Sequence, residues 1–399
     1  MKSSISSIFV MIIIFLSSIL LNGIFYIYFH LGGLIYFFLK LPKFFRLNIY
    51  IFFVILYLVI LFFLSLKNGF EFEDILRDFI YILKPFVSFL LGFQLSKLKN
   101  SQEILINSVV IASLVYFIVF FTQAAFLSIN LSGLNIQYWR TSLGAGELII
   151  PILIILIHSG IFFYKKLISK KIILLTLYAQ LLVTFSRVSL LFIIIYHLIH
   201  AFSISGLKGL NAKLRLGMYL ALISLFFISL SSFLEINFIN KIAGSLKEIT
   251  AVDTSDIVVA STYWRGFELF LVLEDLKTYS LLDLIFGKGL GYQLQLPFEI
   301  KLAGNNYREL WYVHNGYLYL FMKLGFIGLI ILCWLLLKFY NACLENGNSK
   351  TFLNSLFLFT ILSTIVMAGP FESNDYAGIL IFMGYIFSKP LKKTTSYEI

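Results

Sequence analysis

The sequence predicts an all-α integral membrane protein that crosses the bilayer about twelve times. Of its 399 residues, 60% are hydrophobic and only 13% are charged, whereas about a quarter of the residues in a soluble domain are charged. The mean hydropathy is +0.94. Apolar runs of about 20 residues, the length that a helix needs to span a membrane, recur along the whole chain. These solid runs lack the alternation of transmembrane β-strands.

Hydropathy places the helices in order along the chain, each ending where polar or charged residues interrupt an apolar run. The first has no small-residue cleavage site and is therefore expected to be retained. The expected helices are 5–22, 24–40, 47–66, 75–96, 103–130, 145–164, 172–185, 188–205, 215–234, 314–340, 351–368 and 374–388. Only the dipeptide Ser186–Arg187 separates the seventh from the eighth, which predicts a tight hairpin tip.

Charge sets the orientation of these helices. With the N-terminus inside, all inner segments are basic, while the short outer segments are acidic or nearly neutral, as the positive-inside rule requires. Both termini are then cytoplasmic. The same rule accounts for the net charge of +11, and no nucleic-acid motif is present. The two cysteines fall at or near the inner end of one helix, which predicts neither a disulfide nor a cysteine metal site.

The predicted topology divides the chain into three parts. Residues 1–234 hold the first nine helices, residues 235–313 form a large extracytoplasmic loop between helices 9 and 10, and residues 314–399 hold the last three helices and a cytoplasmic tail. The loop is the most polar part of the chain. We expect it to contribute to a site at the outer membrane surface.

Three arginines, Arg140, Arg187 and Arg265, lie on the outer side beside apolar or aromatic sequence. A charged residue at membrane depth is costly, so it points to function. The planar guanidinium suits a diphosphate, and Arg187 also lies where a helix begins, which favours anions. These arginines predict an anionic lipid head group at the outer leaflet. Arg140 could instead be an interfacial anchor, and Arg265 could simply stack on Trp264.

His314 and Asn315 open the tenth expected helix at its outer end. His314 is the only histidine expected on the outer side, and a neutral imidazole can accept a proton there; the alternative is a histidine that only caps the helix. On a helical wheel Gly325 and Gly328 lie near the His314 face and leave it smooth for another helix or a lipid chain. Lys323 points to the opposite face, where snorkelling or a local partner would have to accommodate it.

Four motifs occur in order over roughly residues 130–390: "TFSRVSLL", "STYWRGFEL", "LIFGKGLGYQ" and "VHNGYLYLFMKLGFIGLI". With the twelve-helix layout and the large outer loop, they resemble the O-antigen ligase and polymerase superfamily. The chain departs from that pattern at two places. Lys323 replaces a glutamate that often precedes the first glycine of the last motif, and Pro151 is followed by Ile152 instead of asparagine.

The resemblance implies a GT-C-like fold and a metal-independent, inverting glycosyltransferase without a cofactor, located in the bacterial cytoplasmic membrane. It would polymerise undecaprenyl-diphosphate-linked repeat units of an O-antigen or capsular polysaccharide at the outer face. Its expected partners are these lipid-linked glycans, membrane lipids, a chain-length regulator and a flippase, but no nucleic acid. Arg187 and Arg265 would contact the donor diphosphate, and His314 would act at the acceptor hydroxyl. Further substrate contacts are expected from Arg140, Ser186, Trp264, Asn315 and Tyr317.

Two other functions stay open. A ligase would transfer the finished glycan to lipid A-core or to a protein, and the motifs do not separate it from a polymerase. Polymerases are more numerous and more divergent, and the Phe-, Ile- and Lys-rich composition suits the AT-rich genomes of many capsule loci. A transporter or flippase would carry charges along several helix interiors and would show internal repeats. In this sequence the helix interiors look nearly uncharged, and we find no convincing repeat.

Overall fold

The computed structural model describes residues 2–20, 25–40, 49–130, 149–159, 173–178, 181, 187–205, 252–253, 259–260, 263–302, 305–345, 350–366, 371 and 376–389. Helices dominate this part of the chain. They are α1 (Lys2–Leu20), α2 (Phe25–Lys40), α3 (Ile49–Lys67), α4 (Phe72–Leu95), α5 (Ser101–Asn130), α7 (Ile149–His158), α9 (Arg187–Ser205), α13 (Trp264–Leu276), α14 (Leu281–Phe286), α15 (Gly316–Glu345), α16 (Lys350–Val366) and α17 (Tyr376–Ser388).

The bundle helices lie where the hydropathy pattern places them, with ends that mostly differ by a few residues. Two of them contain stretches long and apolar enough to cross a membrane, Ser101–Val119 in α5 and Gly316–Asn341 in α15. Shorter apolar helices accompany them. The expected helix 215–234 and half of 172–185 lie outside the described residues. The number of crossings and their orientation remain predictions.

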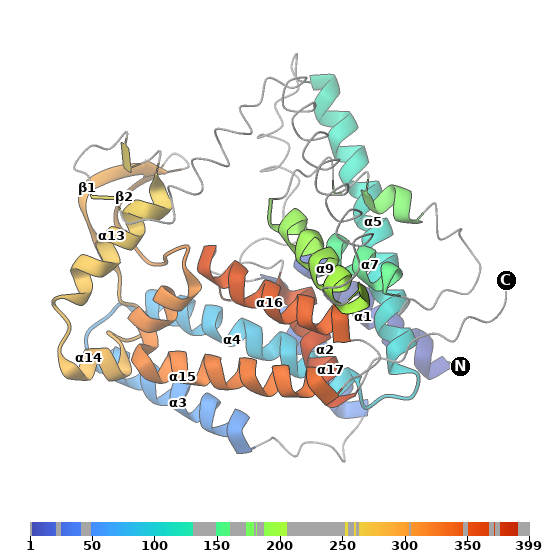
Figure 1. Ribbon diagram of the computed structural model, residues 1–399. Helices are drawn as coiled ribbons and strands as arrows, with labels where there is room; N and C mark the ends of the chain where they lie inside the picture. Colours follow the sequence, from blue (N-terminus) through green and yellow to red (C-terminus); the bar gives the residue numbers. More distant parts are fainter. Residues whose placement is uncertain are drawn as a thin grey trace.

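The helices pack around two apolar cores. In one, α1, α5, α7 and α9 pack with α16, α17 and the C-terminal half of α4. In the other, α3 and the N-terminal half of α4 pack against α15, α13 and the loop that precedes the hairpin. Figure 1 shows α3, α4 and α15 running alongside one another, with α13, α14 and the hairpin gathered at one end of this group.

The polar cap at that end is built from the predicted outer loop. Its strands β1 (Leu294–Leu302) and β2 (Asn305–Leu310) form an antiparallel hairpin. The register pairs Leu294 with Leu310 at the base and is irregular between Gln295 and Ile300. The hairpin base therefore brings the residues before β1 close to those after β2, immediately before α15 begins.

Two glycines allow α4 and α17 to approach closely. A Cβ on Gly92 would lie 1.9 Å from the carbonyl oxygen of Ile381, and one on Gly384 would lie 1.9 Å from that of Phe89. Small residues at such crossings let helix backbones make close van der Waals contact, which drives helix association in membranes. This contact lies within the first apolar core, and α4 continues from it into the second.

We expect Gly384→Ala to lower the stability of the purified protein by about 1–3 kcal/mol, because the added methyl group collides with backbone. The measurement is the thermal unfolding midpoint in detergent. Gly32→Ala in α2 is the matched control, since a Cβ on Gly32 would have no other atom within 4 Å, and we expect it to be neutral or slightly stabilising. Equal midpoints for the two variants would contradict the close crossing.

Candidate functional site

His314 precedes α15 and is not part of the helix. The helix begins at Gly316, and Asn315 caps it, because its Oδ1 accepts hydrogen bonds from the backbone N–H groups of Tyr317 and Leu318, both at 3.1 Å. Such a cap satisfies amides that have no partner within the helix. The helical wheel that starts at His314 is therefore wrong. The imidazole belongs to the segment between β2 and α15, which is part of the polar cap.

The carboxylate of Glu268, on α13, holds His314. Glu268 Oε1 lies 2.9 Å from His314 Nδ1, and Oε2 accepts the His314 backbone N–H at 3.0 Å. The glutamate side chain is 4% exposed and the histidine side chain 28% exposed. A carboxylate at Nδ1 fixes the tautomer with the proton on that nitrogen, so Nε2 carries the lone pair. The pair can therefore accept a proton at Nε2 and stabilise the resulting imidazolium.

The short helix α13 supplies two of the predicted site residues together with Glu268. Arg265 lies three residues before Glu268 and is partly buried, and residues at this spacing are neighbours on a helix surface. Trp264 opens the helix and contacts Phe267, which stacks on Phe298 of β1 with ring centroids 5.4 Å apart. These ring contacts fix α13 against the hairpin and thereby fix the Glu268 carboxylate.

The other predicted site residues are less closely associated with this pair. Tyr317 donates a hydrogen bond of 3.3 Å from its hydroxyl to the Ile361 carbonyl and so ties α15 to α16. Arg187 is the first residue of α9, but its side chain lies outside the described part, as do Arg140 and Ser186. The structure thus brings together Trp264, Arg265, His314 and Asn315.

The glycine-rich loop Gly287–Gln293 looks in sequence like a phosphate-binding loop, which would require available backbone amides. Three of its amides donate to neighbouring helices. The acceptors are Met322 O for Lys288 N, Ser65 Oγ for Leu290 N and Asp78 Oδ2 for Gly291 N, each at 2.8 Å. The loop therefore seats the polar cap on α3, α4 and α15.

Lys323 has a partner that the sequence did not reveal. Its side chain and that of Asp78 on α4 are fully buried, and Nζ lies 2.5 Å from Asp78 Oδ2. The same ammonium donates to the carbonyl oxygen of Tyr292, and the Tyr319 hydroxyl donates to Asp78 Oδ1 at 3.4 Å. The expectation of nearly uncharged helix interiors is wrong at this point. A buried lysine is tolerated because a buried carboxylate neutralises it.

Gly325 breaks α15, and of the two expected neighbours, another helix or a lipid chain, the structure places another helix against it. Its φ is +62°, and a Cβ there would lie 2.4 Å from the carbonyl oxygen of Ile285. The end of α14 packs against this position so closely that no side chain fits there. The Tyr57 hydroxyl donates to the Leu324 carbonyl at 3.0 Å, which supplies a partner where the helical hydrogen bonding is interrupted. The kink and the cap are thus packed together.

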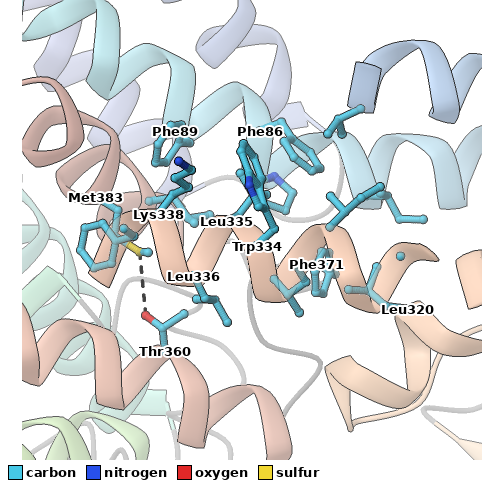
Figure 2. A pocket seen from close by; sticks show the side chains of 18 of the residues that line it. Phe86, Phe89, Leu320, Trp334, Leu335, Leu336, Lys338, Thr360, Phe371 and Met383 are labelled. Carbon is cyan, nitrogen blue, oxygen red and sulfur yellow. Dashed lines mark hydrogen bonds between the residues drawn. The ribbon is translucent and has the colours of Figure 1, made fainter. Parts of the chain in front are cut away.

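An apolar cavity of about 110 Å³ lies between α3, α4, α15, α16 and α17. Figure 2 shows its aromatic lining, with Leu320 and Phe371 towards one end and Phe89 and Lys338 towards the other. Gly328 also lines it. Leu320 is six residues after His314, so one end of the cavity lies near the polar cap. Its lining is apolar and its volume is that of a few methylene groups.

Tyr292 is held at both its backbone and its side chain. Its hydroxyl donates to Asp275 Oδ1 at 2.7 Å. Burial first, and then the Asp275 carboxylate, raise the pKa of Tyr292, so this hydroxyl stays protonated as a donor throughout the physiological range. Together with the Lys323 contact, this bond fixes the residue that follows the glycines.

No group of three or more His, Cys, Asp or Glu side chains in the described ranges could hold a metal ion. Comparisons of the chain with known protein families, curated proteins and solved structures give no match. Sequence reasoning missed Glu268 and Asp78. The signal for each was a single acid within apolar helical sequence, in "RGFELF" and "LRDFIY".

We expect Gly287→Ala to loosen the cap. Its φ is +78°, and a Cβ would lie 2.5 Å from the backbone of Lys323. Gly69→Ala is the control, because Gly69 has φ +83° but nothing within 4 Å of that position. Both variants place a side chain at positive φ, which costs roughly 1–3 kcal/mol. Gly287 also has a ψ of 174°, in a region that is essentially restricted to glycine, so its variant adds backbone strain as well as a collision. Amide hydrogen exchange of residues 287–293 should rise in Gly287→Ala alone, and equal exchange in the two variants would contradict this packing.

Proposed function

We propose that the chain is a glycosyltransferase of the bacterial cytoplasmic membrane that polymerises undecaprenyl-diphosphate-linked repeat units of an O-antigen or capsular polysaccharide. In this proposal it crosses the membrane twelve times in a GT-C-like arrangement, with both termini in the cytoplasm and the cap at the outer face. One observation carries the proposal. The Glu268–His314 pair is a ready proton acceptor at the start of a long apolar helix.

The residues supply the parts of a single displacement. The acceptor hydroxyl gives its proton to His314 Nε2, and its oxygen attacks the anomeric carbon of the donor sugar. The bond from that carbon to the diphosphate oxygen breaks with inversion, and undecaprenyl diphosphate leaves with the electron pair. Arg265 and Arg187 would stabilise the charge that develops on this leaving group. Glu268 would stabilise the imidazolium until the proton is released.

The apolar cavity supports a lipid-linked substrate. It lies between membrane-type helices and begins near the cap, so a short stretch of a substrate's hydrocarbon chain would lie there while the diphosphate faces the outer surface. A ligase would use the same donor residues and differ only in its acceptor. A transporter would need charges free to alternate between partners, whereas Lys323 and Asp78 are fixed by the backbone of a loop.

We expect His314→Ala, Arg187→Ala and Arg265→Ala each to abolish polymer in cells while single lipid-linked repeats accumulate at normal protein levels, because each variant removes the base or a diphosphate contact. The readout is the size distribution of the glycan. Arg308→Ala is the matched control, since the Arg308 side chain on β2 is 80% exposed. Full polymer length and yield in His314→Ala would show that this histidine is not the base.

We expect Glu268→Gln to lower kcat by about 10²–10⁴-fold, the range for general acid–base catalysis, with little change in KM. The amide N–H of glutamine would face Nδ1 and favour the tautomer with the proton on Nε2, which cannot accept one. Steady-state kinetics of the purified protein measure this split. Glu309→Gln, at an exposed position on β2, controls for loss of a carboxylate. An unchanged kcat would remove Glu268 from the mechanism.

A further inference from the structure

We propose that Asp78 and Lys323 form a docking socket that recognises the backbone of Gly291 and Tyr292 by its polarity and thereby positions His314. The docking follows from the contacts of the buried pair, while the positioning role rests on the proposed function. Neither residue is placed at the reacting groups. Both are positioning residues that act through the cap.

The socket presents one acceptor and one donor to the loop. Asp78 Oδ2 accepts the Gly291 N–H at 2.8 Å, and the Lys323 ammonium donates to the Tyr292 carbonyl oxygen. The two side chains also pair with each other at 2.5 Å and are fully buried. A buried pair needs further hydrogen-bond partners, and here the loop backbone supplies two of them. The orientation of the pair, with the acid on α4 and the base on α15, matches the donor and the acceptor of the loop.

The face of α4 that carries Asp78 also holds the chain on either side of the hairpin. Before β1, Gln293 Nε2 donates to Asp74 Oδ2 at 2.5 Å. After β2, Trp311 stacks on Tyr81, with ring centroids 5.4 Å apart and planes 11° apart. The Arg77 guanidinium lies 4.7 Å from the centre of the Trp311 ring. Asp74, Arg77, Asp78 and Tyr81 thus form one platform along about two turns of α4.

A short series of contacts connects this platform to the imidazole. Gly291 and Tyr292 lead into Leu294, which pairs with Leu310 at the hairpin base. Trp311 follows and lies against Tyr312 with ring centroids 4.2 Å apart, and the Tyr312 ring lies 5.4 Å from that of His314. Displacement of the loop from the socket would therefore move the segment that carries His314. The Glu268–His314 pair, which bridges α13 and this segment, would lose its alignment.

Exchanging the two residues tests this inference. In Asp78→Lys/Lys323→Asp the ion pair between α4 and α15 is kept, but an ammonium faces the Gly291 N–H and a carboxylate faces the Tyr292 carbonyl. Donor would meet donor, and acceptor would meet acceptor. The matched control is Glu274→Lys/Lys277→Glu, which exchanges an ion pair whose side chains are 47% and 68% exposed. Two readouts are measured, the amide exchange of residues 287–293 and steady-state glycan transfer.

We expect the control to match the wild type. In the exchanged socket the loop amides should exchange at least about tenfold faster, and kcat should fall at least about tenfold with KM within about twofold, because the loss of one backbone hydrogen bond is worth about a factor of ten. Wild-type exchange and turnover in the swapped protein would overturn the socket. Faster exchange with unchanged kcat would overturn the positioning role.

A second variant covers the case in which the exchanged protein does not fold. Asp78→Asn/Lys323→Met buries no charge, keeps an acceptor for Gly291 and removes the donor to Tyr292. Faster exchange of the loop amides is expected here too, and wild-type exchange would again overturn the socket. If the wild-type protein transfers no glycan, the proposed function fails, while the exchange measurement still decides the docking.

Discussion

The buried ion pair between Asp78 and Lys323 is the interaction on which the rest of the structure depends. Removing two charges from water costs several kcal/mol per ion, and the cost is offset only when their geometry is good and their remaining hydrogen-bonding groups are satisfied. Both conditions hold, because Gly291, Tyr292 and Tyr319 complete the pair. Three parts of the chain that are distant in sequence, α4, α15 and the glycine loop, therefore meet at one point.

The ion pair lies between an apolar helix bundle and a polar cap. On one side lie apolar helices joined by the close contact between α4 and α17 and containing an apolar cavity. On the other lies a polar cap in which α13 and the residues before α15 bring Glu268 to His314. The glycines of the loop have positive φ angles and approach neighbouring side chains or backbone closely, which allows the cap to fit tightly onto the bundle. The arrangement places the Glu268–His314 pair at the cap end of the bundle, and a small apolar cavity begins near that end.

Much of this architecture could be predicted from the sequence, because apolar runs and their interruptions are local properties of the chain. The positions of the bundle helices followed from them, and the start of α15 was placed two residues early, at His314. The helices α13 and α14 and the hairpin were not predicted. Nor were the partners of buried charges, because Lys323 pairs with a residue 245 positions away and His314 with one 46 positions away. No periodicity encodes such contacts. At Gly325 the sequence left another helix and a lipid chain open, because both need the same small residue, and the structure places the end of α14 there. The kink at Gly325 was not predicted.

We propose that the Glu268–His314 pair acts in glycosyl transfer from a lipid diphosphate. The most direct test incubates the purified protein in vesicles with one synthetic undecaprenyl-diphosphate-linked repeat unit, with a chelator present. Mass spectrometry then measures both the glycan and the released lipid. We predict a ladder of lengthened lipid-linked glycans, with one undecaprenyl diphosphate released for each new linkage. Intact starting material, or a ladder that disappears when the chelator is added, would contradict this assignment.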